Sequence, residues 1–214
     1  FAAVLLITPL FGLIGTMVVE NKLAFFSDAL GHSGLTGIAI GVLLGITDPT
    51  LAMVLFAVFF AWLLNVIKRS QVSCNDTIIS VFSSTAIALG LVLLSSQSSF
   101  SKYSSYLIGD ILTIQFQELF VIALVFIAVN VFWFVCFNRL LAITINRSVA
   151  VSRNMPVQLV EWLFITVIAV VVMVSIKWVG ILLINSLLIL PAAAGRNIAL
   201  GMRQFHFFSV IFSV

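Results

Sequence analysis

The chain has 214 residues, of which 63% are hydrophobic and 8% are charged, and its formal net charge is +3. Its mean hydropathy is +1.30. A soluble domain carries about 25% charged residues, so this composition excludes a soluble globular protein and predicts an all-α, polytopic transmembrane helical bundle. Membrane topology accounts for the positions of the basic residues, and we expect no binding to nucleic acid.

Stretches without Asp, Glu, Lys or Arg define the expected spans, because a bilayer core of about 30 Å takes roughly 20 residues of helix. The chain starts and stops inside apolar runs and has no initiator Met. We therefore expect a single transmembrane domain over 1–214, in a fragment that lacks both termini, with about eight spans of which the first and last are truncated. The runs are 1–19, 29–47, 49–67, 77–101, 119–138, 162–176, 178–195 and 204–214.

The basic residues indicate the orientation, since Lys and Arg concentrate on the cytoplasmic side of a membrane protein. If the turn from Glu20 to Lys22 is cytoplasmic, alternation of the spans puts eight of the ten basic residues inside. Lys102 and Lys177 are the two that fall outside. A wrong number of spans would scramble this asymmetry, so it supports the count.

Two connections carry further predictions. The outer segment YLIGDILTI (106–114) is apolar but too short to cross, which predicts a short surface or re-entrant helix at the outer face with Asp110 at its centre. The longest cytoplasmic connection is 139–156, which carries three arginines. Pro156 then starts the next helix, because proline is tolerated in the first turn.

The sequence lacks the GxxxxGK[ST], HExxH and GxSxG patterns. We therefore expect a chain that is not an enzyme and has no ATPase motif of its own. Charges inside the membrane are then the informative residues, because each is costly unless it is paired or hydrated.

The stretch FFSDALGHSGLTGIAIGVLLG (25–45) places Asp28 and His32 four residues apart, so both lie on one face of a helix. A carboxylate and an imidazole suit a divalent ion such as Zn²⁺ or Mn²⁺. Spacing alone leaves open that Asp28 is a helix N-cap and that His32 bonds a carbonyl. Gly37, Gly41 and Gly45 form a small-residue stripe that predicts packing of this helix into the bundle interior.

Asn185 lies in the middle of the span WVGILLINSLLILPAAAGR. Polar amides inside a membrane usually face another helix. A structural hydrogen bond and a role in a transport pathway both remain open for this residue.

Four segments in register resemble a known family: FSDALGHSGLTGIAIG, DTIISVFSSTAIALGLVLLS, YLIGDILTI and KWVGILLINSLLILPAAAGRNIA. They look like the membrane permease subunit of bacterial ABC importers for zinc, manganese or iron, and the resemblance runs from about residue 10 to 204. It implies a homodimeric, multi-pass permease in the bacterial cytoplasmic (inner) membrane, with its path on the two-fold axis. It also implies a cytoplasmic ABC ATPase, an extracytoplasmic metal-binding protein and alternating access. Zn²⁺ or Mn²⁺ would be the cargo, and no cofactor would be bound permanently.

The same resemblance assigns residues. It implies that Asp28 and His32 hold the metal in transit. Gly109 and Asp110 match an element near the outer mouth, which makes Asp110, with Asn185, a candidate for the path or gate. The 139–156 connection would couple to the ATPase, with Arg139, Asn146, Arg147 and Arg153 as the expected contact residues.

The sequence departs from the family pattern at two places. Some zinc-specific members have an additional histidine where this chain has Ser83 and Ser84, which favours manganese relative to zinc. Relatives often carry an acidic residue at or just after the position of Asn146.

Two other functions are compatible with a membrane bundle of this size. An ion-coupled secondary carrier of metals needs buried acids in several spans, and Asp28 is the one clear case. An ABC permease for a metal chelate such as a siderophore would have a wide path without paired metal ligands.

Overall fold

The computed structural model describes residues 2–68, 75–96, 103, 105–110, 114 and 116–214. Within these residues the chain forms helices joined by turns, without a β-strand. The helices are α1 (Ala2–Glu20), α2 (Ala24–Leu43), α3 (Pro49–Lys68), α4 (Asn75–Ser96), α6 (Ser105–Ile108), α7 (Phe116–Ile145), α8 (Arg147–Ser152), α9 (Val157–Val179), α10 (Ile181–Ile198) and α11 (Met202–Ser213).

In the described residues, each of the eight predicted apolar runs overlaps one of the longer helices, which are α1, α2, α3, α4, α7, α9, α10 and α11. Residue 1 and residues 97–101, which belong to two of these runs, lie outside the described residues. In the described part of the chain, six helices are long and apolar enough to cross a membrane: α1, α3, α4, α7, α9 and α10. Helix α2 has 20 residues, but Asp28 and His32 lower its hydropathy, and α11 has 12 residues. The predicted all-α transmembrane bundle is therefore confirmed, with six spans by this measure.

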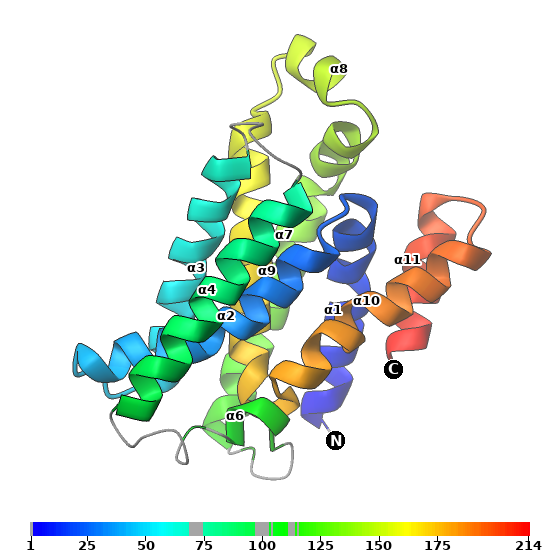
Figure 1. Ribbon diagram of the computed structural model, residues 1–214. Helices are drawn as coiled ribbons and strands as arrows, with labels where there is room; N and C mark the ends of the chain where they lie inside the picture. The colour runs from blue at the N-terminus through cyan, green and yellow to red at the C-terminus, as the bar shows by residue number, and fades with distance from the viewer. Residues whose placement is uncertain (1, 69–74, 97–102, 104, 111–113, 115) are drawn as a thin grey trace.

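The connections alternate between two ends of the bundle (Figure 1). Helix α6 lies at one end and α8 at the opposite end. The turn between α1 and α2, which carries Lys22, and the last turn of α10, which carries Arg196, both lie on the α8 side of the bundle. This arrangement agrees with the orientation expected from the basic residues, with α8 at the cytoplasmic end and α6 at the outer end.

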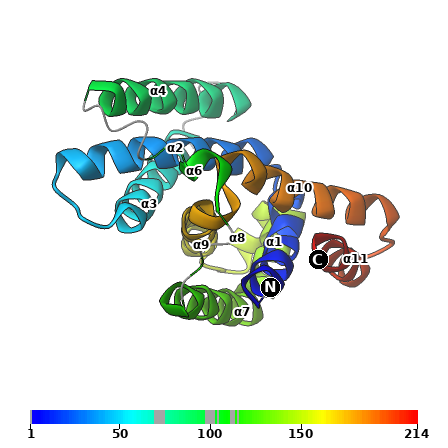
Figure 2. The ribbon, with the colours of Figure 1, turned by 90° about the horizontal axis from the view of Figure 1, so that it is seen from below.

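Helix α9 lies at the centre of the bundle, where it contacts α2, α3, α7 and α10 (Figure 2). Its apolar residues recur on all sides of the helix, and most of them from Phe164 onward are buried, whereas Leu159 and Leu163 nearer its start are exposed. Helix α2 lies between α4 on one side and α3 and α9 on the other. Helix α10 crosses α1 and α2, and α11 packs against α1 and α10.

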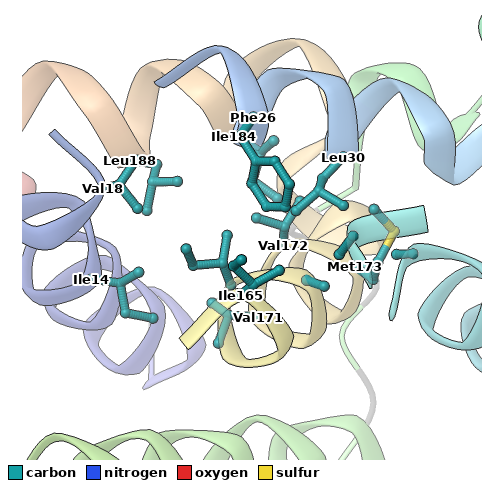
Figure 3. Packing of buried hydrophobic residues seen from close by; sticks show 14 of the residues in the cluster. Ile14, Val18, Phe26, Leu30, Ile165, Val171, Val172, Met173, Ile184 and Leu188 are labelled. Atoms are coloured by element: carbon teal, nitrogen blue, oxygen red, sulfur yellow. The ribbon is translucent and has the colours of Figure 1, made fainter. Parts of the chain in front are cut away.

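The core joins the helices that carry the candidate site. Buried side chains of α1, α2, α9 and α10 point toward one another (Figure 3). Phe26 and Leu30 of α2 belong to the same cluster as Ile184 of α10 and Val172 of α9. The beginning of α2 is thus fixed against both α9 and α10 by apolar contact.

Glycines allow the helices around α2 to approach closely. A Cβ added to Gly37 would lie 3.0 Å from the Cα of Met53 on α3, and one added to Gly34 would lie 3.1 Å from Ile176 on α9. Gly41 also faces α3, at Ala52. The predicted stripe is correct for Gly37 and Gly41 and wrong for Gly45, because α2 ends at Leu43. Gly45 instead forms the following turn, with φ +73° and no atom within 4 Å of an added Cβ.

We expect Gly15→Ala to destabilise the crossing of α1 and α10. An added Cβ would overlap the carbonyl oxygen of Leu188, so the two helices must separate, at a cost of about 1–3 kcal/mol. That cost outweighs the gain of up to about 1 kcal/mol in helix propensity. Thermal unfolding of the purified protein in detergent measures the difference.

Gly201→Ala is the matched control. Gly201 has an extended φ of −165° and no atom lies within 4 Å of an added Cβ, so its melting temperature should stay near that of the wild type. Equal melting temperatures for the two variants would contradict the close contact of α1 with α10.

Candidate functional site

Asp28 and His32 lie inside α2 rather than at its start. The helix begins at Ala24, with Leu23 as N-cap, so Asp28 is in the second turn and the N-cap alternative is wrong. His32 Nε2 lies 3.7 Å from Asp28 Oδ1, and the two side chains are 33% and 42% exposed, respectively. Both side chains are therefore on one face of α2, as the spacing predicts, and both remain accessible to an ion.

Asn185 of α10 meets Asp28 directly. Its Nδ2 donates a hydrogen bond to Asp28 Oδ1 over 3.1 Å. The hydroxyl of Ser27 lies 3.1 Å from Asn185 Oδ1, as a donor. The structure thus brings together two residues that sequence analysis treated separately, and it adds Ser27, which sequence analysis missed because a serine in a helix gives no signal of its own.

The polar cluster formed by Ser27, Asp28, His32 and Asn185 lies between the two ends of the bundle. Helices α2 and α10 both run obliquely (Figure 1). Helix α10 starts at the outer end, next to α6, and its last turn reaches the other end of α1, where Arg196 Nη1 lies 3.2 Å from Glu20 Oε2. Asn185 lies between these two points. The cluster is therefore an intramembrane polar site, which marks a functional candidate.

Helix α4 borders the same face of α2. The hydroxyl of Thr36, one turn beyond His32, donates a hydrogen bond to the backbone carbonyl of Ala86. Gly90 packs against Thr36, with an added Cβ 2.6 Å from its Oγ1. Ser83 and Ser84 precede Ala86 on α4, the helix that flanks the site.

The outer segment differs from its prediction. Helix α6 has four residues and ends at Ile108, so Asp110 follows the helix rather than lying at its centre, and 111–113 lie outside the described residues. Gly109, with φ +78°, ends the helix and packs backbone to backbone against Gly180, with φ +84°. The Asp110 amide donates to the carbonyl of Lys177 over 3.3 Å. Asp110 therefore lies at the outer end and is exposed, away from the polar cluster.

An ion pair holds the same region. Glu118, in the first turn of α7, binds Lys177 at the end of α9, and its other oxygen accepts a hydrogen bond of 3.1 Å from Trp178 Nε1. We call the contact of α6 with Gly180, together with this ion pair, the outer cap. Sequence analysis missed Glu118, although an acid at the start of one span and a base at the end of another, both on the outer side, were a usable signal.

The cytoplasmic connection 139–156 is largely helical. Helix α7 continues to Ile145, and α8 follows at once. Asn146 is the N-cap of α8, accepting a hydrogen bond from the amide of Val149. Arg147 pairs with Glu161 of α9 over 3.0 Å, which raises the pKa of Arg147 above its ordinary value. Two of the four expected coupling residues therefore make contacts within the chain: Asn146 caps α8, and Arg147 attaches α8 to α9.

The surface at and beside α8 exposes both apolar and basic side chains. Val149 and Val151 of α8 and Ile145 at the end of α7 are exposed, and so are Arg139 on α7 and Arg153 after α8. Exposed apolar side chains next to charged ones are a feature of protein interaction sites.

Within the described residues, no group of three or more His, Cys, Asp and Glu side chains could hold a metal ion. One chain therefore offers Asp28 and His32 as a pair of ligands. Two ligands bind an ion more loosely than the four of a structural zinc site, which suits passage better than storage.

A polytopic helical bundle that carries an accessible acid and imidazole on one helix face is typical of a membrane transport subunit. The sequence matches the ABC 3 transport family over residues 1–214, and the chain belongs to that family. This confirms the resemblance found in the sequence.

Three relatives illustrate the membership. The chain is 29% identical over 98% of its length to the high-affinity zinc uptake system membrane protein ZnuB of Buchnera aphidicola subsp. Baizongia pistaciae, covering 80% of that protein. It is 27% identical over 85% of its length to the manganese import system permease protein ScaB of Streptococcus parasanguinis, covering 65% of that protein. The structure of PsaBC from Streptococcus pneumoniae in complex with Fab matches 99% of this chain and 76% of that one, with a TM-score of 0.84 and 26% identity.

We expect Gly180→Ala to weaken the outer cap. With φ +84° and ψ 152°, Gly180 adopts a conformation that is essentially restricted to glycine, and an added Cβ would overlap the backbone of Ile108. The loss of stability should exceed that of Gly45→Ala by about 1–3 kcal/mol. Thermal unfolding in detergent measures both variants.

Gly45→Ala separates the two effects, because Gly45 also has a positive φ but faces open space. If both variants lose the same stability, backbone conformation alone is the cause and the packed contact contributes nothing.

Proposed function

We propose that this chain is the permease subunit of an ABC importer that moves a divalent transition metal, manganese or zinc, into the cytoplasm by alternating access. The observation that carries the proposal is the pair Asp28 and His32, accessible inside a membrane bundle. Relatives named for zinc uptake and for manganese import support this cargo.

The pair supplies suitable chemistry for a metal in transit. A carboxylate oxygen and an imidazole nitrogen both bind Zn²⁺ and Mn²⁺. We infer that two copies of the chain face each other across a two-fold axis and that each contributes its pair, so that four ligands hold one ion. The residual exposure of both side chains supports this arrangement, since a second copy has access to them.

The two ends of the chain suit two different partners. The exposed side chains at and beside α8, with Arg139 on α7 and Arg153 after α8, would offer apolar and charged contacts to a cytoplasmic ATPase. The cap at Asn146 and the ion pair of Arg147 with Glu161 would make α8 move together with α9. The outer cap, with Asp110 exposed beside it, would receive an extracytoplasmic metal-binding protein. The complete transporter would lie in the bacterial cytoplasmic membrane.

The other two functions receive less support. A secondary carrier needs acids in several spans, and among the described residues Glu118 lies at the outer end, where Lys177 neutralises it. A permease for a metal chelate does not need paired ligands in its path, whereas this chain has Asp28 and His32 together.

We expect Asp28→Asn and His32→Ala each to lower metal uptake about tenfold or more, because loss of second-shell support alone costs 10–100-fold in metal affinity. Uptake of Mn²⁺ and Zn²⁺ by cells that produce the complete transporter, scaled to the amount in the membrane, measures the effect. Asp48→Asn, at the exposed turn after α2, is the matched acid control and should retain uptake. Wild-type uptake in both site variants would remove Asp28 and His32 from the path.

We expect Val151→Asp to reduce the amount of ATPase that co-purifies with the chain about tenfold or more. A buried carboxylate in an apolar interface costs more than the 1.4 kcal/mol that corresponds to a tenfold change. Leu200→Asp, at an exposed apolar position in the turn after α10, is the control and should keep the ATPase. Undiminished co-purification with Val151→Asp would place the docking surface elsewhere.

A further inference from the structure

We propose that Asn185, held by Ser27, is a positioning residue that orients the Asp28 carboxylate and ties the metal site to α10. The inference rests on the proposed function, because it concerns how the transit site is built. Three observations carry it: the direction of the hydrogen bonds, the neutral character of the partner, and the contacts that fix α10 at both ends.

The orientation of the Asn185 amide follows from its two neighbours. An amide has a donor end and an acceptor end, and the hydrogen-bond network decides which end points where. The Asp28 carboxylate accepts only, so it requires Nδ2, which lies 3.1 Å from Asp28 Oδ1. The opposite end, Oδ1, then faces the hydroxyl of Ser27 over 3.1 Å. The same hydroxyl lies 2.8 Å from the carbonyl of Ala24, so its single proton is shared between an acceptor on its own helix and Asn185.

The Asn185 amide is a neutral partner, and among the described residues it leaves one oxygen of the Asp28 carboxylate without a contact. In the described residues, both contacts of Asp28, to Asn185 and to His32, use Oδ1, and Oδ2 is left for an incoming ion. Three glutamates differ, because each pairs with an arginine or a lysine rather than with an amide and a histidine: Glu20 with Arg196, Glu118 with Lys177, and Glu161 with Arg147. A neutral amide fixes a carboxylate without cancelling its charge, which is the requirement for a metal ligand.

Helix α10 is held at both of its ends. It begins directly after Gly180, whose backbone packs on that of Ile108 in the outer cap, and its last turn is paired with α1 through Arg196 and Glu20. Asn185 lies in the second turn of α10 and Ser27 and Asp28 lie on α2. A shift of α10 therefore moves the amide that holds the ligand, so the geometry of the site depends on the outer cap.

The test uses the complete transporter in lipid nanodiscs and in cells. Asn185→Leu removes both hydrogen bonds at similar volume, Ser27→Ala removes one, and Ser186→Ala, at the exposed neighbouring position, is the matched control. Equilibrium binding of Mn²⁺ and of Zn²⁺, and the KM and maximal rate of uptake, are measured for each. We expect Asn185→Leu to weaken binding about 10-fold and to raise KM with the maximal rate retained. Ser27→Ala should act in the same direction by less, and Ser186→Ala should match the wild type.

A structural role gives a different pattern. If Asn185 only held the helices together, its loss would lower the melting temperature and the maximal rate and would leave the KM unchanged. The double variant Ser27→Ala/Asn185→Leu should bind metal as Asn185→Leu does, because both residues act through one chain of hydrogen bonds. Additive losses, or an unchanged metal affinity in Asn185→Leu, would overturn the inference.

Asp28→Asn in the same assays separates this inference from the function on which it rests. If Asp28→Asn loses metal and Asn185→Leu does not, the transit site stands and the positioning role falls. If Asp28→Asn binds metal as the wild type does, both fall.

Discussion

A carboxylate inside an apolar bundle must find its hydrogen-bond donors within the protein, because the lipid offers none. In this chain Asp28 finds its donor on α10, at Asn185. That single requirement brings the start of α2 and the start of α10 together, and the apolar side chains around them complete the contact. The close approach of the other helices to α2 then follows from its glycines, which replace side-chain bulk with backbone contact. The polar cluster therefore also contributes to the packing of α2 against α10.

The remaining acids show what the same constraint does elsewhere. Glu20, Glu118 and Glu161 lie toward the ends of their helices, and each joins two helices through a basic partner. These pairs fasten α1 to α10, α7 to α9, and α8 to α9. The glutamates near the ends of the bundle connect helices through ion pairs, whereas the Asp28 carboxylate between the two ends stays accessible to a cation.

The helices were predictable because their residues are apolar over the length that a bilayer requires. The pair Asp28 and His32 was predictable because four-residue spacing is a local property of a helix. The start of α2 was not predictable. The uncharged run begins only after Asp28, whereas the helix already begins at Ala24. Gly37, Gly41 and Gly45 are evenly spaced, four residues apart, but α2 ends at Leu43. Gly41 therefore packs against α3, whereas Gly45 forms the turn that follows. Asp28 and Asn185 are 157 residues apart, and no local pattern joins them. The position of Asp110 likewise depends on the contact of Gly109 with Gly180, which exists only in the folded chain.

Helix α7 has 30 residues, which corresponds to about 45 Å of length at 1.5 Å per residue, whereas the hydrocarbon core is about 30 Å thick. Arg139 lies two turns before its end, and arginines of this kind settle at the headgroup level. The last turns of α7, beyond Arg139, therefore exceed the length that the hydrocarbon core requires, and α8 follows them at that end of the bundle (Figure 1). The length of α7 would then set the distance between the membrane and any cytoplasmic partner that binds at α8. Deleting one turn between Arg139 and Ile145 would shorten that distance by about 5.4 Å with little rotation of α8, and would draw Arg147 away from Glu161 on α9.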